Sequence, residues 1–118
     1  MDYKWKIEFY KTAVDKSPVD EFVDKLDIKA QRKILEALEL LKELGVGLGM
    51  PHSKKLIGTP LWELRILGSD SIRVFYISQT DKIFLLLHAF QKKKQKTDRK
   101  EIKLALDRFV DHKSRTQN

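Results

Sequence analysis

The chain has 118 residues, of which 42% are hydrophobic and 35% charged, so it can build one modest core and is expected neither to be disordered nor to hold two domains. It contains no cysteine, which excludes disulfides, thiol nucleophiles and cysteine-based zinc sites. Its formal net charge of +7 favours an anionic partner such as nucleic acid, an anionic membrane or an acidic protein.

Two further features favour a cytoplasmic protein. The longest uninterrupted apolar run, residues 83–87, is far shorter than the ~20 apolar residues of a membrane-spanning helix. Charged side chains recur through the first eight residues, where a signal peptide needs an apolar stretch. We therefore expect a cytoplasmic location and no membrane contact, and the absence of cysteine agrees with a reducing compartment.

The positive charge is concentrated in the second half of the chain. Residues 60–118 carry 13 basic and 7 acidic side chains, a net charge of +6, whereas residues 1–59 carry a net charge of +1. The densest basic stretch spans residues 92–103. Such a run is often only a solvated surface, and it is equally compatible with contacts to the phosphates of a nucleic acid.

The first predicted elements are a strand and two helices. Apolar residues alternate with charged ones over residues 5–9, which predicts a short, half-buried strand. A helix is expected to begin at Ser17 and Pro18, because serine can cap free backbone N–H groups and proline suits the first helical position. Asp27 is the expected cap of a second, longer helix, and Gly45 is its expected end.

The pattern then changes from helices to strands. Alternating apolar residues and short turns predict a short strand followed by three longer ones in an antiparallel meander. The expected strands span residues 54–57, 61–67, 72–78 and 83–91, with turns at residues 68–70 and 79–81.

A last helix is expected to start at Thr97 or Asp98, either of which can cap it. The sequence thus predicts a single domain over residues 1–112 and a frayed tail over residues 113–118. The expected fold class is α+β, with an antiparallel sheet of four or five strands, two N-terminal helices on one face and a C-terminal helix. Function is then to be sought on the sheet face opposite the two N-terminal helices.

Strand alternation places charged and aromatic side chains together on that opposite face. The wholly apolar sets of each strand are expected to lie against the helices. The remaining set is Glu63, Arg65, Arg73, Phe75, His88, Phe90 and Lys92. Guanidinium groups bind phosphate oxygens and aromatic rings stack on bases, so this face, together with the basic run beside it, is a candidate RNA-binding surface.

Each of these residues also has a structural interpretation. Glu63 can pair with Arg73 across the strands, where an exposed ion pair contributes little. A lone histidine such as His88 is more often structural than catalytic. Phe75 and Phe90 can be core residues beneath the last helix, and the sequence alone leaves these alternatives open.

Several segments, in order, carry a resemblance to a known family. They are Lys54-Lys55-Leu56, Leu61-Trp62-Glu63-Leu64-Arg65-Ile66, Ile72-Arg73-Val74-Phe75-Tyr76, the run from Leu86 to Thr97, Glu101-Ile102, and Ala105 to Arg108. Together they resemble the HigB-like branch of the RelE/ParE toxins of bacterial type II toxin–antitoxin systems, which are often of phage origin. The resemblance covers nearly the whole chain and rests on the combination of W-E-L-R, R-V-F-Y and H-A-F-Q-K-K.

The resemblance implies a compact α+β toxin with a microbial-RNase-like sheet. It also implies an endoribonuclease that cleaves messenger RNA, usually on the ribosome, and that a cognate helix-turn-helix antitoxin neutralises. Contact with operator DNA is expected only through the complex with that antitoxin. Because the superfamily also contains inhibitors of DNA gyrase, two alternatives stay open: a non-catalytic gyrase inhibitor and a plain RNA-binding module.

Metal-independent RNA cleavage needs a base, an acid and positive charge, because the 2′-hydroxyl attacks the adjacent phosphate and the 5′-oxygen leaves. We assign the positive charge to Arg65 and Arg73, a role as base or acid to His88, and phosphate binding or proton donation to Lys92. The further residues expected to contact RNA are Lys54, Lys55, Phe90, Lys93, Lys94 and Lys96. No metal or cofactor is expected, because three isolated histidines without close acidic partners make a poor metal site.

Overall fold

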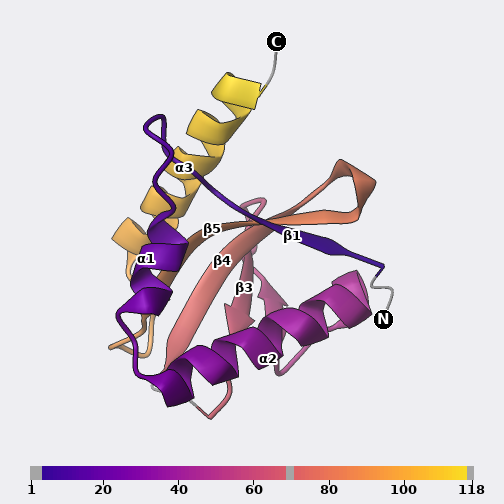
Figure 1. The fold of residues 1–118 in the computed structure, drawn as a ribbon, viewed down its shortest axis with the longest axis vertical. Coiled ribbons are helices and arrows are strands. Elements are labelled where there is room, and N and C mark those ends of the chain that lie inside the picture. The colour runs from indigo at the N-terminus through magenta and orange to yellow at the C-terminus, as the bar shows by residue number, and fades with distance from the viewer. Residues whose placement is uncertain (1–3, 69–70, 117–118) are drawn as a thin grey trace.

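The computed structural model describes residues 4–68 and 71–116, which form one five-stranded sheet with helices on both of its faces (Figure 1). The strands are β1 (Lys6–Phe9), β2 (Ser53–Lys55), β3 (Trp62–Arg65), β4 (Ile72–Gln79) and β5 (Ile83–Gln91). The helices are α1 (Pro18–Asp24), α2 (Ile28–Leu44) and α3 (Arg99–Thr116), with short 3₁₀ turns at Gly45–Gly47 and Thr80–Lys82. In the described part of the chain, no helix combines the length and the apolar character that crossing a bilayer requires.

The sheet is mixed, which corrects the prediction of a wholly antiparallel sheet. Its strand order is β1-β5-β4-β3-β2, and the neighbours from β5 to β2 pair antiparallel, as the meander predicts. The first strand instead pairs parallel with β5, with Lys6 opposite Ile83 and Phe9 opposite Leu86. Two helices and three strands separate these partners along the chain, so no local turn signal could reveal their relative direction.

Local signals account for most helix ends, but Ser17 corrects one expectation: its hydroxyl makes no capping hydrogen bond, and α1 begins at Pro18 without one. The Asp27 carboxylate accepts a hydrogen bond from the backbone N–H of Ala30 at 2.8 Å, at the start of α2. Gly45 ends that helix at a φ of 57°, and a Cβ at this position would lie 2.1 Å from the Trp5 indole. Glycine is therefore required there both by the backbone and by the packing. Asp98 accepts from the backbone N–H of Lys100 just ahead of α3.

The last helix continues beyond the expected domain limit at residue 112 and reaches Thr116. Near its end, Arg115 pairs with Asp111 at 2.7 Å and also donates a hydrogen bond to the Lys11 carbonyl. Residues 113–116 are thus part of α3. Residues 117–118 of the expected tail, and residues 69–70 of the expected turn, lie outside the described residues.

Each face of the sheet has its own hydrophobic core. On one face, Val19 of α1 and Leu38 and Leu41 of α2 pack in a cluster with Val74 and Phe84 of the sheet. The other face is covered by α3, and the side chains buried there are Tyr10, Leu61, Phe75, Ile77, Leu85, Leu87, Phe90 and Ala105. Figure 1 shows α2 and α3 on different sides of the sheet. The face on which we expected the functional residues is therefore partly closed by α3.

A β-bulge between β4 and β5 reverses the expected faces of part of β5. Phe75 is opposite His88, but Tyr76 is opposite Leu86, so Leu87 is the extra residue. Because side chains alternate with a period of two, one extra residue exchanges the two faces on one side of the bulge. Leu85 and Leu87 consequently lie on the α3 face, although the alternation had placed them against the N-terminal helices. Phe84 and Leu86, which it had placed on the open face, pack beneath those helices.

Candidate functional site

A buried carboxylate joins two of the predicted arginines on the α3 face of the sheet. The side chain of Glu63, on β3, is only 4% exposed. Its Oε1 accepts a hydrogen bond from Nε of Arg65 at 3.2 Å and lies 3.7 Å from Nε of Arg73 on β4. Arg65 and Arg73 are directly opposite each other in the β3–β4 register, so one carboxylate bridges both guanidinium groups.

The two guanidinium groups keep part of their surface and part of their bonding capacity for another anion. Their side chains are 26% exposed for Arg65 and 17% exposed for Arg73. Arg73 donates through Nη1 to the carbonyl of Ile72, and its Nε is buried near Glu63 without a hydrogen-bond partner among the described residues, so an anion would be bound through the exposed part of the guanidinium. Because two positive charges face one negative charge, the cluster has one positive charge in excess. It is suited to bind a phosphate at its open side.

His88 occupies the neighbouring row of the sheet and is bonded to α3 through both ring nitrogens. Its Nε2 lies 3.0 Å from Oε1 of Glu101, and its Nδ1 lies 3.1 Å from Nη1 of Arg108. A guanidinium can only donate, so Nδ1 accepts and Nε2 carries the proton that it donates to Glu101. Burial lowers the pKa of His88, and the charge of Arg108 lowers it further, whereas the hydrogen bond with Glu101 opposes this shift. Because Nδ1 accepts from Arg108 and so carries no proton, the ring is neutral in this arrangement.

These bonds make His88 a link between the sheet and α3. Arg108 also donates to the carbonyl of Leu87 at 2.9 Å, and its guanidinium lies 5.9 Å from the centre of the Tyr10 ring. In this arrangement neither nitrogen of the histidine is free to contact RNA. The geometry favours the structural interpretation of His88, and its role in proton transfer stays a prediction.

The aromatic residues predicted on this face lie at the junction of its core and its surface. Phe75 is fully buried beneath α3, with its ring centre 5.0 Å from that of Phe90. The His88 ring stacks on Phe90 at 5.2 Å, with 15° between the ring planes. Phe75 is thus a core residue. Phe90 is also largely buried, but it contributes to the wall of a pocket.

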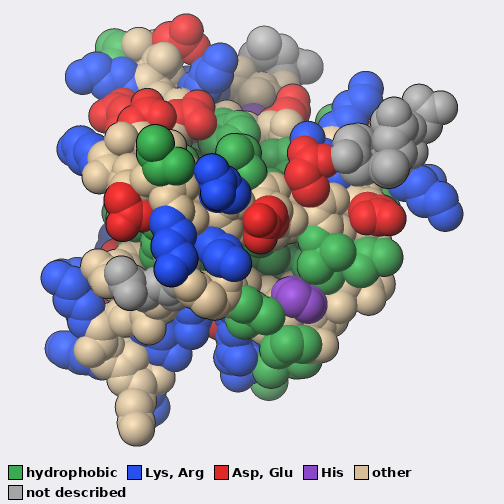
Figure 2. Space-filling model, turned by 60° about the horizontal axis from the view of Figure 1, so that its bottom comes forward, with side chains coloured by type: hydrophobic (Ala, Val, Ile, Leu, Met, Phe, Trp, Pro, Cys, Tyr) green, Lys and Arg blue, Asp and Glu red, His purple; other side chains and the backbone are tan. Residues whose placement is uncertain are grey.

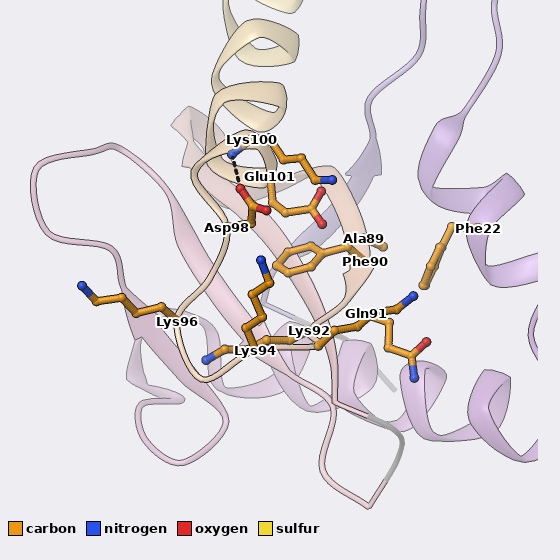
Figure 3. A pocket seen from close by; sticks show the side chains of 11 residues that line it. Phe22, Ala89, Phe90, Gln91, Lys92, Lys94, Lys96, Asp98, Lys100 and Glu101 are labelled. Carbon is orange, nitrogen blue, oxygen red and sulfur yellow. Dashed lines mark hydrogen bonds between the residues drawn. The ribbon is translucent and has the colours of Figure 1, made fainter.

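That pocket, of about 520 Å³, lies where the end of β5 and the loop after it meet the start of α3 (Figure 3). Phe22 of α1, Ala89 and Phe90 give it an apolar lining, while Asp98 and Glu101 contribute carboxylates. In Figure 3 the Phe90 ring lies among these side chains, close to Glu101, whereas Lys96 points outward. The basic lining residues are Lys92, Lys93, Lys94, Lys96 and Lys100. Four of the lysines predicted to act on RNA are therefore gathered at one pocket.

The sheet register connects this pocket to the arginine cluster. Arg65 is opposite Arg73, and Arg73 is opposite Phe90, so these residues form one row across β3, β4 and β5. Neighbouring strands lie about 4.8 Å apart, so this row spans roughly 10 Å. That length is comparable to one or two nucleotides of an extended RNA strand. The arginines and the pocket can thus contact the same short segment of a polyanion.

The two predicted lysines of β2 point to opposite faces of the sheet. Lys54 is opposite Glu63, which places it on the α3 face beside the arginine cluster. Lys55 is opposite Trp62, and its ammonium group donates to the carbonyl of Thr59 in the turn ahead of β3. Of this pair, only Lys54 shares a face with the other candidates.

Three residues to which the sequence analysis assigned no role complete the site. Phe22 reaches the pocket from α1, and Glu101 and Arg108 reach His88 from α3. The sequence did contain a signal for Glu101 and Arg108. Together with Ala105 they recur at helical spacing, on the face of α3 that lies against the sheet. Charged residues on the apolar face of an amphipathic helix require partners on the surface that it covers.

The surface charge is unevenly distributed. Figure 2 shows many Lys and Arg side chains on its left side, the side on which the loop after β5 lies in Figure 1, and a hydrophobic patch at its lower right. Among residues 4–68 and 71–116, no three His, Asp or Glu side chains are grouped so that they could hold a metal ion.

The comparison with known families matches residues 21–110 to the family described as Phage derived protein Gp49-like (DUF891). No curated protein matches the chain. The matched segment begins within α1, contains β2 to β5 and ends within α3, so it includes every residue of the site described above. Since it covers most of the sequence, the chain belongs to the family of phage-derived Gp49-like proteins.

Proposed function

We propose that this protein is the toxin of a type II toxin–antitoxin system and that it cleaves messenger RNA on translating ribosomes without a metal ion. The phage-derived family supports this proposal, as does the resemblance of the W-E-L-R, R-V-F-Y and H-A-F-Q-K-K segments to the HigB-like branch of the RelE/ParE toxins. The observation that carries it is the pair Arg65 and Arg73, held by the buried carboxylate of Glu63 next to a lysine-lined pocket.

In the proposed reaction, the 2′-oxygen of a nucleotide attacks the adjacent phosphorus and the bond from phosphorus to the 5′-oxygen breaks. The products are a 2′,3′-cyclic phosphate and a free 5′-hydroxyl group. A base takes the proton of the 2′-hydroxyl, and an acid gives a proton to the departing 5′-oxygen. The five-coordinate phosphorus intermediate carries an additional negative charge, which Arg65 and Arg73 stabilise through their guanidinium N–H groups.

The lysines and His88 have less direct roles in this reaction. Lys92 lies at the pocket, where its ammonium group can hold a neighbouring phosphate or protonate the 5′-oxygen. His88 can act as base or acid only after Nδ1 releases Arg108 or Nε2 releases Glu101. Most of the rate enhancement is therefore assigned to positioning of the RNA and to charge stabilisation, each of which can supply several kcal/mol.

The test maps RNA 5′ ends after the protein is induced in growing bacteria. New ends inside translated frames are expected for the wild type, and a strong decrease is expected for Arg65→Lys and Arg73→Lys. Lysine keeps the positive charge near Glu63 but loses the planar group that binds phosphate through two N–H donors. The matched control is Arg32→Lys on the exposed surface of α2, which should cleave as the wild type does.

Two outcomes would contradict this function. DNA breaks and an SOS response with intact messenger RNA would identify a gyrase inhibitor. Binding of RNA without any new 5′ ends would identify an RNA-binding module. Full cleavage by both lysine variants would instead remove Arg65 and Arg73 from the mechanism.

A further inference from the structure

The pocket beside the arginines contains more than a phosphate site requires. A phosphate is bound by N–H donors and positive charge, which the lysines at the rim supply. The aromatic rings of Phe22 and Phe90 and the carboxylate of Glu101 contribute neither of these. Aromatic rings beside a placed acceptor are instead typical of a site for a flat, partly polar ring.

Glu101 is the pocket carboxylate that is held in a fixed orientation and can still accept further hydrogen bonds. Its side chain is 21% exposed, and its Oε1 accepts from Nε2 of His88 at 3.0 Å. A carboxylate can accept about four hydrogen bonds through its two oxygens, so this contact orients the group without saturating it. Asp98, the other carboxylate, accepts from the backbone N–H of Lys100 at the start of α3 and is exposed, so water competes for its remaining acceptor sites more than at Glu101.

We propose that the pocket holds one unstacked nucleobase with an exocyclic amino group, adjacent to the phosphate bound by Arg73. This inference rests on the proposed function. The amino N–H donates to Glu101, and the ring packs against the side chains of Phe22 and Phe90. Adenine, cytosine and guanine carry such an amino group. Uracil has carbonyl oxygens on both sides of its N3–H, and these repel a carboxylate.

The spacing of the residues fits one nucleotide. Phe90 is directly opposite Arg73, so the pocket wall lies one strand, or about 4.8 Å, from the arginine. A base and its own phosphate are separated by a single sugar, which can span this interval. The volume of about 520 Å³ lies within the range of roughly 300–1,000 Å³ that is usual for small-molecule sites.

The test measures binding of single-stranded 2′-O-methyl RNAs that are all uridine except for one central nucleotide. The methyl group blocks the 2′-hydroxyl, so binding is observed without cleavage. Fluorescence anisotropy should give about 5–10-fold tighter binding for a central adenosine, cytidine or guanosine than for uridine. This ratio lies in the lower part of the range of discrimination that one polar contact to a base provides. Glu101→Gln should reduce this preference to less than about twofold, because an amide can also donate to the uracil carbonyl.

Matched variants separate the pocket from general effects of charge and packing. Asp107→Asn removes one negative charge from the exposed side of α3, outside the pocket, and should keep the wild-type preference. Phe22→Leu keeps the apolar bulk but removes the aromatic face. It should weaken binding of all the RNAs more than Phe109→Leu, a matched change in α3 that packs on the second core outside the pocket. Glutamine at position 101 retains an acceptor for the His88 N–H, and thermal unfolding verifies that each variant is folded.

The outcomes distinguish this inference from the proposed function. Equal binding of all the RNAs by a wild type that still cleaves messenger RNA would overturn the base subsite alone. An unchanged preference in Glu101→Gln would do the same. A wild type that neither binds these RNAs nor cleaves messenger RNA would overturn the proposed function, and the subsite with it.

Discussion

Replacing Glu63 with glutamine tests whether the buried carboxylate positions the two arginines. The change keeps the shape of the side chain and an acceptor for Nε of Arg65, but it removes the charge that faces both guanidinium groups at 3.2 and 3.7 Å. Breaking a fully buried pair costs about 3–5 kcal/mol when it leaves an uncompensated charge. Both arginines here are partly exposed to solvent, which screens their charges, so we expect a loss of about 1–2 kcal/mol in the free energy of unfolding.

The functional effect should distinguish positioning from simple charge. Without the carboxylate, the cluster has a second positive charge in excess, so RNA should bind with equal or greater affinity at low salt. The guanidinium groups are less well oriented, and displacement by about 1 Å can reduce a rate 10²-fold. We therefore expect cleavage to decrease about 10–100-fold while binding is maintained.

The assays are urea unfolding, RNA binding and single-turnover cleavage of messenger RNA on ribosomes. Glu36→Gln on the exposed surface of α2 removes the same charge away from the site and serves as the control. Cleavage within twofold of the wild type, at the expected loss of stability, would show that Glu63 supports the fold and does not position the arginines. If binding and cleavage decreased together, the expectation that removal of the negative charge maintains RNA binding would be wrong.

The remaining predictions address the lysines, the histidine and the partner. Replacing Lys92, Lys93 and Lys94 with glutamine should reduce the slope of log affinity against log salt by roughly one per lost phosphate contact, and an unchanged slope would identify the run as a solvated surface. Because the folded protein lowers the pKa of His88, the stability that its neutral ring contributes is complete above about pH 6.5 and is lost as the pH falls toward the folded pKa. Urea unfolding at several pH values should therefore show a smaller loss of stability on acidification for His88→Gln, and an identical pH dependence would refute the neutral state. Co-expression with the adjacent reading frame should restore growth and yield a complex whose association rate falls with added salt, since an acidic antitoxin surface is expected to complement the basic half of the chain; failure of both rescue and complex formation would contradict the toxin–antitoxin assignment.

The local structure could be predicted because its causes are local. Asp27 caps α2 through a backbone group three residues away, and Gly45 ends that helix through its own backbone conformation. The limits of β5, Ile83–Gln91, follow from an apolar run bounded by polar residues, and the structure has the same limits. In each case the determining atoms lie within a few residues of the signal.

The missed features depend on contacts between residues far apart in the sequence. The parallel pairing of β1 with β5 is decided by the path of the chain through two helices and three strands. The bulge beside Phe75 exchanges the faces of Leu85 and Leu87, and no residue in that apolar run marks it. The face expected to be open is covered because Ile102, Ala105 and Phe109 of α3 need an apolar surface to pack against.

Helix α3 joins the second core to the candidate site, and this explains why His88 is difficult to interpret from sequence. Ala105 packs against the sheet, while Glu101, one turn earlier, reaches both His88 and the pocket. Arg108 then fixes the tautomer of His88 from the other side. One of the hydrogen bonds that attach the helix to the sheet, between His88 and Glu101, thus also orients the pocket carboxylate. Through its contact with His88, Glu101 both holds α3 on the sheet and presents its carboxylate to the pocket. Only a variant that keeps this hydrogen bond while removing the charge, such as Glu101→Gln, can separate the structural role from the role in recognition.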